Sequence, residues 1–323
     1  MIFDSHADIW TDVTMMRQRG DRDIFKKKHL DKYITGGVNS GIFVIWIDPP
    51  FDINPKKRVL EIIENMSVEI LENKDILVIA KNYDELITGI ENDKLSIIIG
   101  MEGLSFIGDN IDWINTMYMF GARHASLTWN EENDLATGVR GNPDRGLTSL
   151  GEKAIKRIED LGIILDVSHL NDKSFWDVAK IASKPLIASH SNCRTLCNNK
   201  RNLTDDQLRF IKEINGVVGL NAFSDFVSDI KEDRDLLHLA DHIDHMVDIM
   251  GIDHIGFGFD FCDYLEGDTM SSFAEEESAN TRNFEDITKV PSLIDELRSR
   301  GYKDSDIEKI SYKNYFRIIK EIL

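Results

Sequence analysis

Short apolar runs alternate along the chain with longer segments in which apolar residues recur at three- and four-residue steps. The short runs predict β-strands, and the longer pattern predicts amphipathic helices. The candidate strands are residues 2–7, 41–47, 76–80, 95–102, 123–129, 163–168, 185–189, 216–223 and 254–259. Helices are predicted between them at 56–73, 82–90, 147–162, 171–182, 203–214 and 235–251. Strands and helices that alternate in this way are typical of parallel strands joined by crossover connections.

The candidate strands are one more than a closed eight-stranded barrel needs. The run at 76–80 ends without a polar functional residue, unlike the runs that carry candidate site residues, so we predict that it is an accessory strand. The other eight are expected to close an α/β barrel of the (β/α)8, or TIM, type. A length of 323 residues fits a single barrel domain over 1–323. Residues 261–290 are predicted to form a long polar loop, and the C-terminal helices are expected to pack outside the barrel.

Charge and composition narrow the range of partners. With 38 basic and 57 acidic residues the formal net charge is −19, which repels nucleic acid and anionic membrane surfaces. No apolar run approaches the roughly 18 residues that span a bilayer, and the N-terminus does not resemble an export signal. The 3 cysteines cannot all pair and have no zinc-knuckle spacing, so we expect a reduced, cytoplasmic setting.

Six side chains with metal-binding or acid/base chemistry lie at or just past the C-terminal ends of predicted strands. In a parallel barrel these ends meet on one face, so the pattern predicts a metal-dependent active site there. Residues two apart on a strand face the same side, and a carboxylate can bridge two cations about 3.5 to 4 Å apart. From spacing alone, a structural hydrogen-bonded pair and satisfied core histidines are alternatives. The six residues are His6, Asp8, Glu102, His169, His190 and Asp260.

Six motifs in order, DSHADIW, GMEG, LTWNEEND, LDVSH, SHSNCRTLCNNKRNLTDDQL and HIGFGFDF, resemble the renal-type (membrane) dipeptidase family of binuclear zinc peptidases. The resemblance runs from His6 to the C-terminal NYFRII. It implies a barrel of the metal-dependent hydrolase type and a zinc-dependent dipeptidase, in which a metal-bridged water hydrolyses small unblocked dipeptides. It assigns one zinc ion to His6, Asp8 and Glu102, and the other to Glu102, His169 and His190. Family members are commonly homodimers, so we expect a homodimer.

The resemblance also implies roles for residues outside the ligand set. Asp260 is expected to move a proton from the attacking water to the leaving amine, with a weak metal ligand or a cap as the alternative. Arg201 is expected to clamp the free carboxylate of the substrate, because its planar guanidinium matches two carboxylate oxygens; a solvated arginine beside Lys200 is the alternative. Trp129 replaces a histidine of the mammalian members, so either its indole N–H, a simple wall contact or the neighbouring Asn130 is expected at the substrate.

Two other functions fit the same sequence. A related binuclear amidohydrolase would act on N-acyl amino acids or cyclic amides, and a catalytically silent barrel would serve as a binding protein. Because all five ligand positions are filled, we favour the enzyme. Three further histidines, His238, His242 and His245, share one face of a predicted helix, and we predict an exposed acidic face there rather than a third metal site.

Overall fold

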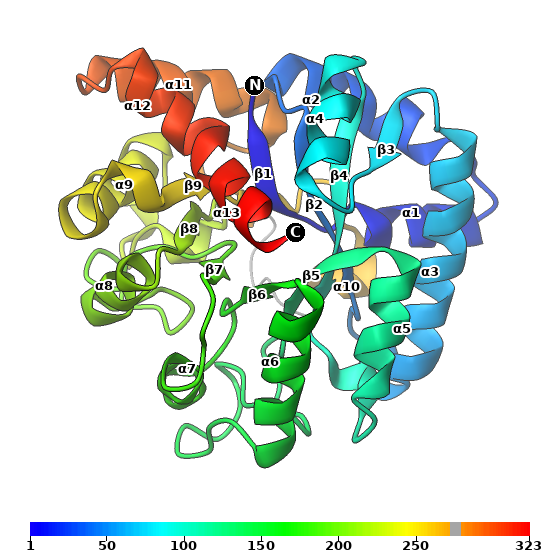
Figure 1. Cartoon of the computed structure of the whole chain (residues 1–323). Helices are drawn as coiled ribbons and strands as arrows, with labels where there is room; N and C mark the ends of the chain where they lie inside the picture. The colour runs from blue at the N-terminus through cyan, green and yellow to red at the C-terminus, as the bar shows by residue number, and fades with distance from the viewer. Residues whose placement is uncertain (272–278) are drawn as a thin grey trace.

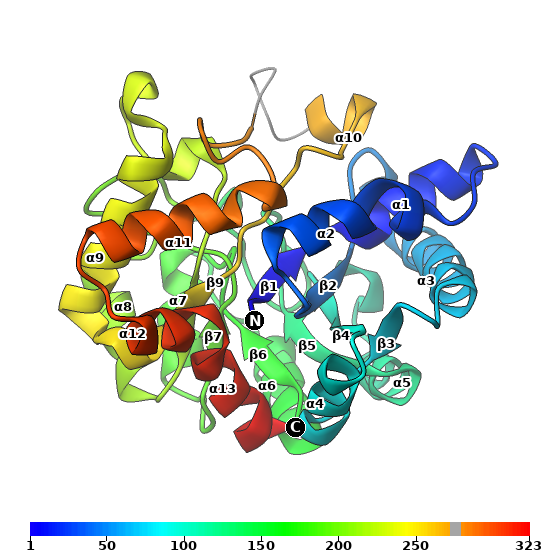
Figure 2. The ribbon, with the colours of Figure 1, turned by 90° about the horizontal axis from the view of Figure 1, so that it is seen from above.

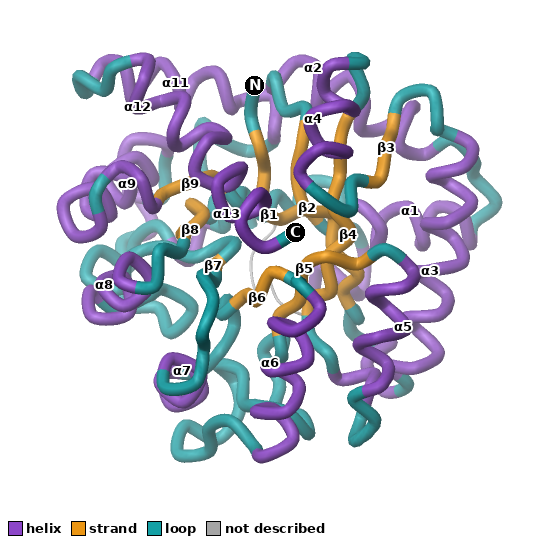
Figure 3. The backbone as a smooth tube through the Cα atoms, in the orientation of Figure 1, coloured by secondary structure: helices purple, strands orange, loops and turns teal. Residues whose placement is uncertain are grey.

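Eight parallel strands close into a barrel in the computed structural model, which describes residues 1–271 and 279–323 (Figures 1 and 3). The ring closes where β2 pairs with β4 in register from Ser40 opposite Ser96 to Trp46 opposite Glu102. A further strand, β3 (Leu77–Ile79), extends the sheet beside β4, which confirms the accessory strand predicted at 76–80. The barrel strands are β1 (Phe3–Ala7), β2 (Ser40–Trp46), β4 (Leu95–Glu102), β5 (Ala122–Ser126), β6 (Ile164–Asp166), β7 (Ile187–Ala188), β8 (Val217–Leu220) and β9 (Ile255–Phe257).

The six helices predicted between the strands are all present, and each begins with a capping side chain. In every case that side chain accepts a hydrogen bond from a backbone N–H of the first turn, which satisfies a group that the helix leaves free. They are α3 (Pro55–Glu72), α4 (Tyr83–Glu91), α6 (Ser149–Leu161), α7 (Asp172–Ala179), α8 (Asp205–Glu213) and α9 (Leu236–Met250), with caps Asn54, Asn82, Thr148, Asn171, Thr204 and Asp235.

Three helices that the sequence pattern did not predict lack such a cap: α1 (Ile9–Gln18), α2 (Leu30–Gly36) and α5 (Asp112–Phe120). Helix α1 opens with Ile9, Trp10 and Thr11, residue types that favour a helix less than alanine or leucine does. It forms because its apolar side chains pack on the barrel, where the rings of Trp10 and Phe43 lie 5.5 Å apart. Tertiary packing therefore decides this helix, which begins directly after Asp8.

The C-terminal helices α11 (Val290–Ser299), α12 (Asp304–Glu308) and α13 (Asn314–Ile322) pack outside the barrel as expected. Helix α13 crosses the N-terminal end of the barrel, and α10 (Gly267–Ser271) lies on the opposite side (Figures 1 and 2). Its Tyr315 is buried, with its hydroxyl 2.7 Å from that of Ser5. A Cβ on Gly256 would lie 2.2 Å from the Tyr315 ring, so only glycine leaves enough space for the Tyr315 side chain at this position.

The predicted loop 261–290 contains structure that its polar composition did not indicate. It includes α10 and a 3-10 turn over Ile287–Lys289, while residues 272–278 lie outside the described part of the chain. Thr269 of α10 donates a 2.9 Å hydrogen bond to Asp48, whose carboxylate also binds Arg58 at 2.7 and 3.1 Å. A buried ion pair thus anchors this part of the loop to the barrel. None of the described helices is long and apolar enough to cross a membrane.

Candidate metal centre

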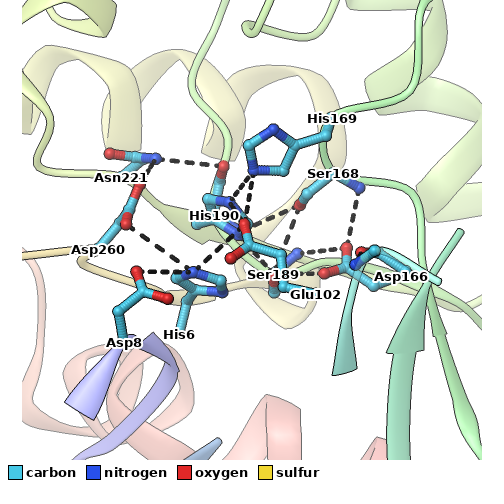
Figure 4. Close-up of polar contacts among 12 residues, drawn as sticks. His6, Asp8, Glu102, Asp166, Ser168, His169, Ser189, His190, Asn221 and Asp260 are labelled. Atoms are coloured by element: carbon cyan, nitrogen blue, oxygen red, sulfur yellow. Dashed lines mark hydrogen bonds and ion pairs between the residues drawn. The ribbon is translucent and has the colours of Figure 1, made fainter. Parts of the chain in front are cut away.

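The six predicted side chains converge at the C-terminal ends of the barrel strands (Figure 4). His6 lies on β1, Glu102 is the last residue of β4, and Asp260 follows β9. The backbone φ angles of His169 and Asp260 are +70° and +57°, in the left-handed region that residues other than glycine seldom adopt, although histidine and aspartate adopt it more often than most. Such conformations cost free energy and are concentrated at functional sites, which fits the position of both residues at this centre.

Glu102 occupies the middle of the cluster. Its Oε1 atom lies 2.8 Å from Nε2 of His169, 3.5 Å from Nε2 of His190 and 3.6 Å from Nε2 of His6. On the other side, Nε2 of His6 lies 3.7 Å from Oδ2 of Asp8 and 3.8 Å from Oδ1 of Asp260. One carboxylate therefore touches imidazoles from both of the expected ligand sets, which is the arrangement that a shared ligand requires.

The cluster leaves buried polar atoms that a cation would satisfy. Both ring nitrogens of His6 and Oδ1 of Asp8 are buried and have no hydrogen-bond partner among the described residues. Burying polar atoms without partners is costly, and native proteins rarely tolerate it. Ligand atoms of two overlapping groups, His6–Glu102–His190 and His6–Asp8–Asp260, lie within 4.8 Å of one another. Imidazole and carboxylate groups at this spacing fit divalent metal ions.

The electrostatics of the cluster favour metal binding as well. Burial, together with the nearby positive charge, holds the pKa values of His169 and His190 well below the ordinary value, so both imidazoles are in the neutral form that binds metal. Against the effect of burial, the carboxylates of Glu102, Asp8 and Asp260 raise the pKa of His6 to about 10, and a metal ion bound among them would take the place of that proton. Burial raises the pKa of Glu102 well above its ordinary value; the charge of His6 opposes this shift, while Asp8 and Asp260 add to it. A bound cation would offset the repulsion among these carboxylates and favour their charged forms.

A second layer of side chains orients the two histidines that follow β6 and β7. The hydroxyl of Ser189 lies 2.7 Å from Nδ1 of His190 and donates a 2.5 Å hydrogen bond to Oδ2 of Asp166. Oδ1 of Asn130 lies 2.9 Å from Nδ1 of His169, so the amide oxygen accepts the ring proton and leaves Nε2 free to face Glu102. Metal-binding histidines usually have such a partner on the second nitrogen. Neither Ser189 nor Asp166 was predicted as a site residue, although Ser189 directly precedes His190 and Asp166 belongs to the LDVSH motif.

A cavity of about 400 Å³ opens beside the cluster. Arg201 is buried, with Nη2 3.2 Å from the carbonyl oxygen of His190, and is not the solvated arginine of the alternative interpretation. The ring of Trp129 lies 5.2 Å from that of Trp46 and 6.1 Å from that of His169, so Trp129 is part of the cavity wall. The lining comprises Asp8, Trp46, Glu102, Trp129, Asn130, Val139, Arg140, His169, Asn198, Asn199, Lys200, Arg201, Phe223, Asp225, Phe226, Asp260 and Cys262.

The prediction of an exposed face for the three histidines of α9 was wrong for His242. This side chain is fully buried; its Nδ1 accepts the N–H of Cys193 at 3.1 Å, and its Nε2 lies 2.9 Å from the carbonyl oxygen of Val227. It thereby joins the loops after β7 and β8, both of which line the cavity. His238 and His245 pair with aspartates, and in the described residues none of the three belongs to a group that fits a metal ion.

The barrel and the histidine–carboxylate cluster at its C-terminal end define a metal-dependent hydrolase. A model of the membrane dipeptidase family, peptidase family M19, matches residues 1–323. The chain belongs to this family and is a metallo-dipeptidase by class. The family resemblance and the barrel fold expected from the sequence are therefore both confirmed.

Individual relatives agree with this assignment. An uncharacterized protein in the pqqA 5′ region of Klebsiella pneumoniae is 36% identical over 242 residues, which cover 72% of this chain and 84% of the relative. An uncharacterized dipeptidase of Schizosaccharomyces pombe is 31% identical over 255 residues, or 77% of this chain and 58% of the relative. The crystal structure of a metallopeptidase from Rhodobacter sphaeroides, liganded with a phosphinate mimic of the dipeptide L-Ala-D-Ala, is 26% identical with a TM-score of 0.87. That match covers 100% of this chain and 99% of the other.

Proposed function

We propose that this protein hydrolyses the peptide bond of small unblocked dipeptides at a centre of two zinc ions. One ion would be held by His6, Asp8 and Glu102, and the other by Glu102, His169 and His190. The observation that carries the proposal is the position of Glu102, whose Oε1 lies within 3.6 Å of imidazoles from both sets. When bound, the zinc ions would polarise the scissile carbonyl and activate the attacking water.

Asp260 is the residue that we assign to proton transfer. Its Oδ2 accepts a 3.0 Å hydrogen bond from Asn221, which orients the carboxylate, and its side chain is 15% exposed on the cavity side of His6. From this position the carboxylate would take the proton of the attacking water and deliver it to the amine of the leaving residue. General acid–base catalysis requires a group that faces both atoms in turn.

Arg201 is the residue that we assign to the terminal carboxylate of the dipeptide. Its guanidinium is buried beside His169, at 3.3 Å from Nε2, so a carboxylate bound there lies next to the metal centre. This arrangement favours substrates that end shortly after the scissile bond. The dipeptide mimic in the related metallopeptidase supports the same substrate class. Trp129 would form the wall along the substrate, and Asn130, which also lines the cavity, would orient His169 through its amide oxygen.

The decisive experiment compares four compounds after removal of metal and reconstitution with zinc. We expect hydrolysis of Ala-Ala, slower hydrolysis of Ala-Ala amide, and none of N-acetyl-alanine or a cyclic amide. Cleavage of N-acetyl-alanine or the cyclic amide in preference to Ala-Ala would instead show an amidohydrolase. A protein that binds two zinc ions and cleaves none of the four would be a binding barrel.

Arg201→Ala tests how the substrate is placed. Because a charge-assisted contact contributes about 1.5 to 3 kcal/mol, kcat/KM for Ala-Ala should fall roughly 10- to 150-fold. The preference for the free acid over the amide should largely disappear. Arg209→Ala, which removes an exposed arginine on α8 outside the cavity, is the matched control. An undiminished free-acid preference in Arg201→Ala would mean that another residue binds the terminal carboxylate.

The homodimer and the cytoplasmic setting that the sequence suggested stay predictions.

A further inference from the structure

Two basic side chains, Arg140 and Lys200, lie at the edge of the cavity. In the described parts of the chain, neither Arg140 nor Lys200 forms an ion pair, although both line the cavity and are exposed. The guanidinium carbon of Arg140 lies 5.7 Å from the centre of the Trp129 ring, which places it over the wall of the cavity. These two cations are therefore available to an anion that enters.

The acidic side chains of the same cavity are already engaged. Asp225 pairs with Arg234, and Asp8, Glu102 and Asp260 all face His6 in the metal centre. Outside the cavity lining, Lys200 acts electrostatically on Asp172, but that carboxylate is held by Arg194 at 2.7 and 2.9 Å. Among the described residues, none of the acidic side chains that line the cavity forms an ion pair with Arg140 or Lys200.

The position of these cations matters because the chain as a whole is strongly acidic. A formal net charge of −19 repels anionic ligands from most of the surface, whereas unpaired positive charges at a cleft attract them locally. Arg140 is close enough to the centre for its charge to act on His169. Arg201 lies deeper and is buried, so positive charge extends from the edge of the cavity to the metal centre.

We propose that the cavity selects dipeptides with an acidic side chain, whose carboxylate is bound by Arg140 and Lys200 while Arg201 binds the terminal carboxylate. The selection rests on the proposed dipeptidase function. A neutral dipeptide has one carboxylate, which Arg201 takes, and leaves the two outer cations unused. An aspartyl or glutamyl side chain supplies the second carboxylate. The Trp129 ring beneath Arg140 favours the positively charged guanidinium at this place.

The test compares substrates that differ in charge but hardly in shape: Ala-Asp with Ala-Asn, and Asp-Ala with Asn-Ala. For the zinc-loaded protein we expect kcat/KM to favour the acid over its amide about 3- to 10-fold in at least one pair, the range of partly solvated ion pairs. The preference should shrink as the salt concentration rises from about 0.05 to about 0.5 M, because exposed charges are screened. A preference based on shape would not respond to salt.

The double variant Arg140→Gln/Lys200→Gln should bring the acid-to-amide ratio close to one. Arg209→Gln removes a positive charge from the outer helix α8 and should leave the ratio as in the wild type. The proposal would be overturned by equal kcat/KM for acid and amide in both pairs, or by an acid-to-amide ratio that is unchanged in the double variant. In either case, cleavage of Ala-Ala would still support the dipeptidase function. If no dipeptide is cleaved, the dipeptidase function fails. Calorimetric binding of Ala-Asp and Ala-Asn to the same proteins then decides the selection on its own.

Discussion

The hydroxyl of Ser189 donates a 2.5 Å hydrogen bond to Oδ2 of Asp166, a buried carboxylate. The same carboxylate accepts the backbone N–H groups of Ser168 and Ser189 at 2.9 and 3.0 Å, and Nε2 of His124 lies 3.0 Å away. These bonds hold the pKa of Asp166 below its ordinary value against the opposing effect of burial. Ser189 is fixed in turn, and its oxygen faces Nδ1 of His190 at 2.7 Å. Asp166 therefore supports the proposed metal ligand His190 indirectly, through Ser189.

Ser189→Ala should weaken zinc binding without changing a ligand. The substitution removes the partner of His190 Nδ1 and leaves the ring free to rotate, so affinity at the site that holds His190 should fall about 10- to 100-fold. Competition with a chromophoric chelator measures this. Ser191→Ala is the matched control, because the Ser191 hydroxyl is also buried but has no hydrogen-bond partner among the described residues. Equal zinc affinities for the two variants would contradict the orienting role.

Glu102→Gln should lower zinc occupancy at both positions, because an amide cannot bridge two cations as a carboxylate does. Elemental analysis after reconstitution and dialysis should show both ions depleted relative to the wild type. Asp8→Asn provides the comparison, since Asp8 belongs to one ligand set only and its loss should deplete one ion. If Glu102→Gln also loses just one ion, Glu102 does not bridge.

Asp260→Asn should retain zinc and lose turnover. The asparagine keeps the shape of the side chain and removes the base, so kcat should fall roughly 100- to 10,000-fold. Asp263→Asn is a suitable control, because Asp263 pairs with Lys32 at 2.6 Å and does not line the cavity. A variant that loses zinc together with activity would identify Asp260 as a ligand, and a near-normal kcat would place the proton shuttle elsewhere.

His242 should make the fold sensitive to mild acid. Burial lowers its pKa from 6.5 to about 4, against the smaller opposing effect of its bond to Val227. As the pH falls, the His242 imidazole therefore becomes protonated near pH 6.5 in the unfolded chain but only near pH 4 in the folded chain. The contribution of His242 to the free energy of unfolding is complete above pH 6.5 and is lost as the pH falls towards 4. The loss is about 3 kcal/mol at most.

His242→Gln removes this proton and should flatten the dependence of the unfolding free energy on pH between 4 and 7, measured by denaturant titration. The variant will be less stable at pH 7 because the bonds to Cys193 and Val227 change. The difference in slope, not the absolute value, is the readout. Parallel curves for His242→Gln and the wild type would show that His242 does not titrate in this range.

Hydrophobic periodicity and capping residues explain which elements were predictable. The helices anticipated from the sequence carry a capping side chain, such as Asn82 or Thr204, so their first turn is encoded locally. Helices α1 and α5 have no such cap, and each buries apolar side chains, such as Trp10 in α1 and Met117 in α5. The accessory strand at 76–80 was also predictable, because a strand that carries no functional residue at its C-terminal end does not have to be part of the barrel around the site.

The sequence by itself determined the alternation of strands and helices, the candidate ligands at the strand ends, and the family. Each of these depends on residues close together in the chain or on the order of motifs. Only the tertiary structure decided that Asp166 supports His190 through Ser189, that Asn130 holds His169, and that His242 is buried. Only the folded chain likewise brings Arg140 and Lys200 to the edge of the cavity without an ion-pair partner in the part of the chain that the structure describes. These relationships join residues from different strands and loops, and neither periodicity nor local propensity records distances across a barrel.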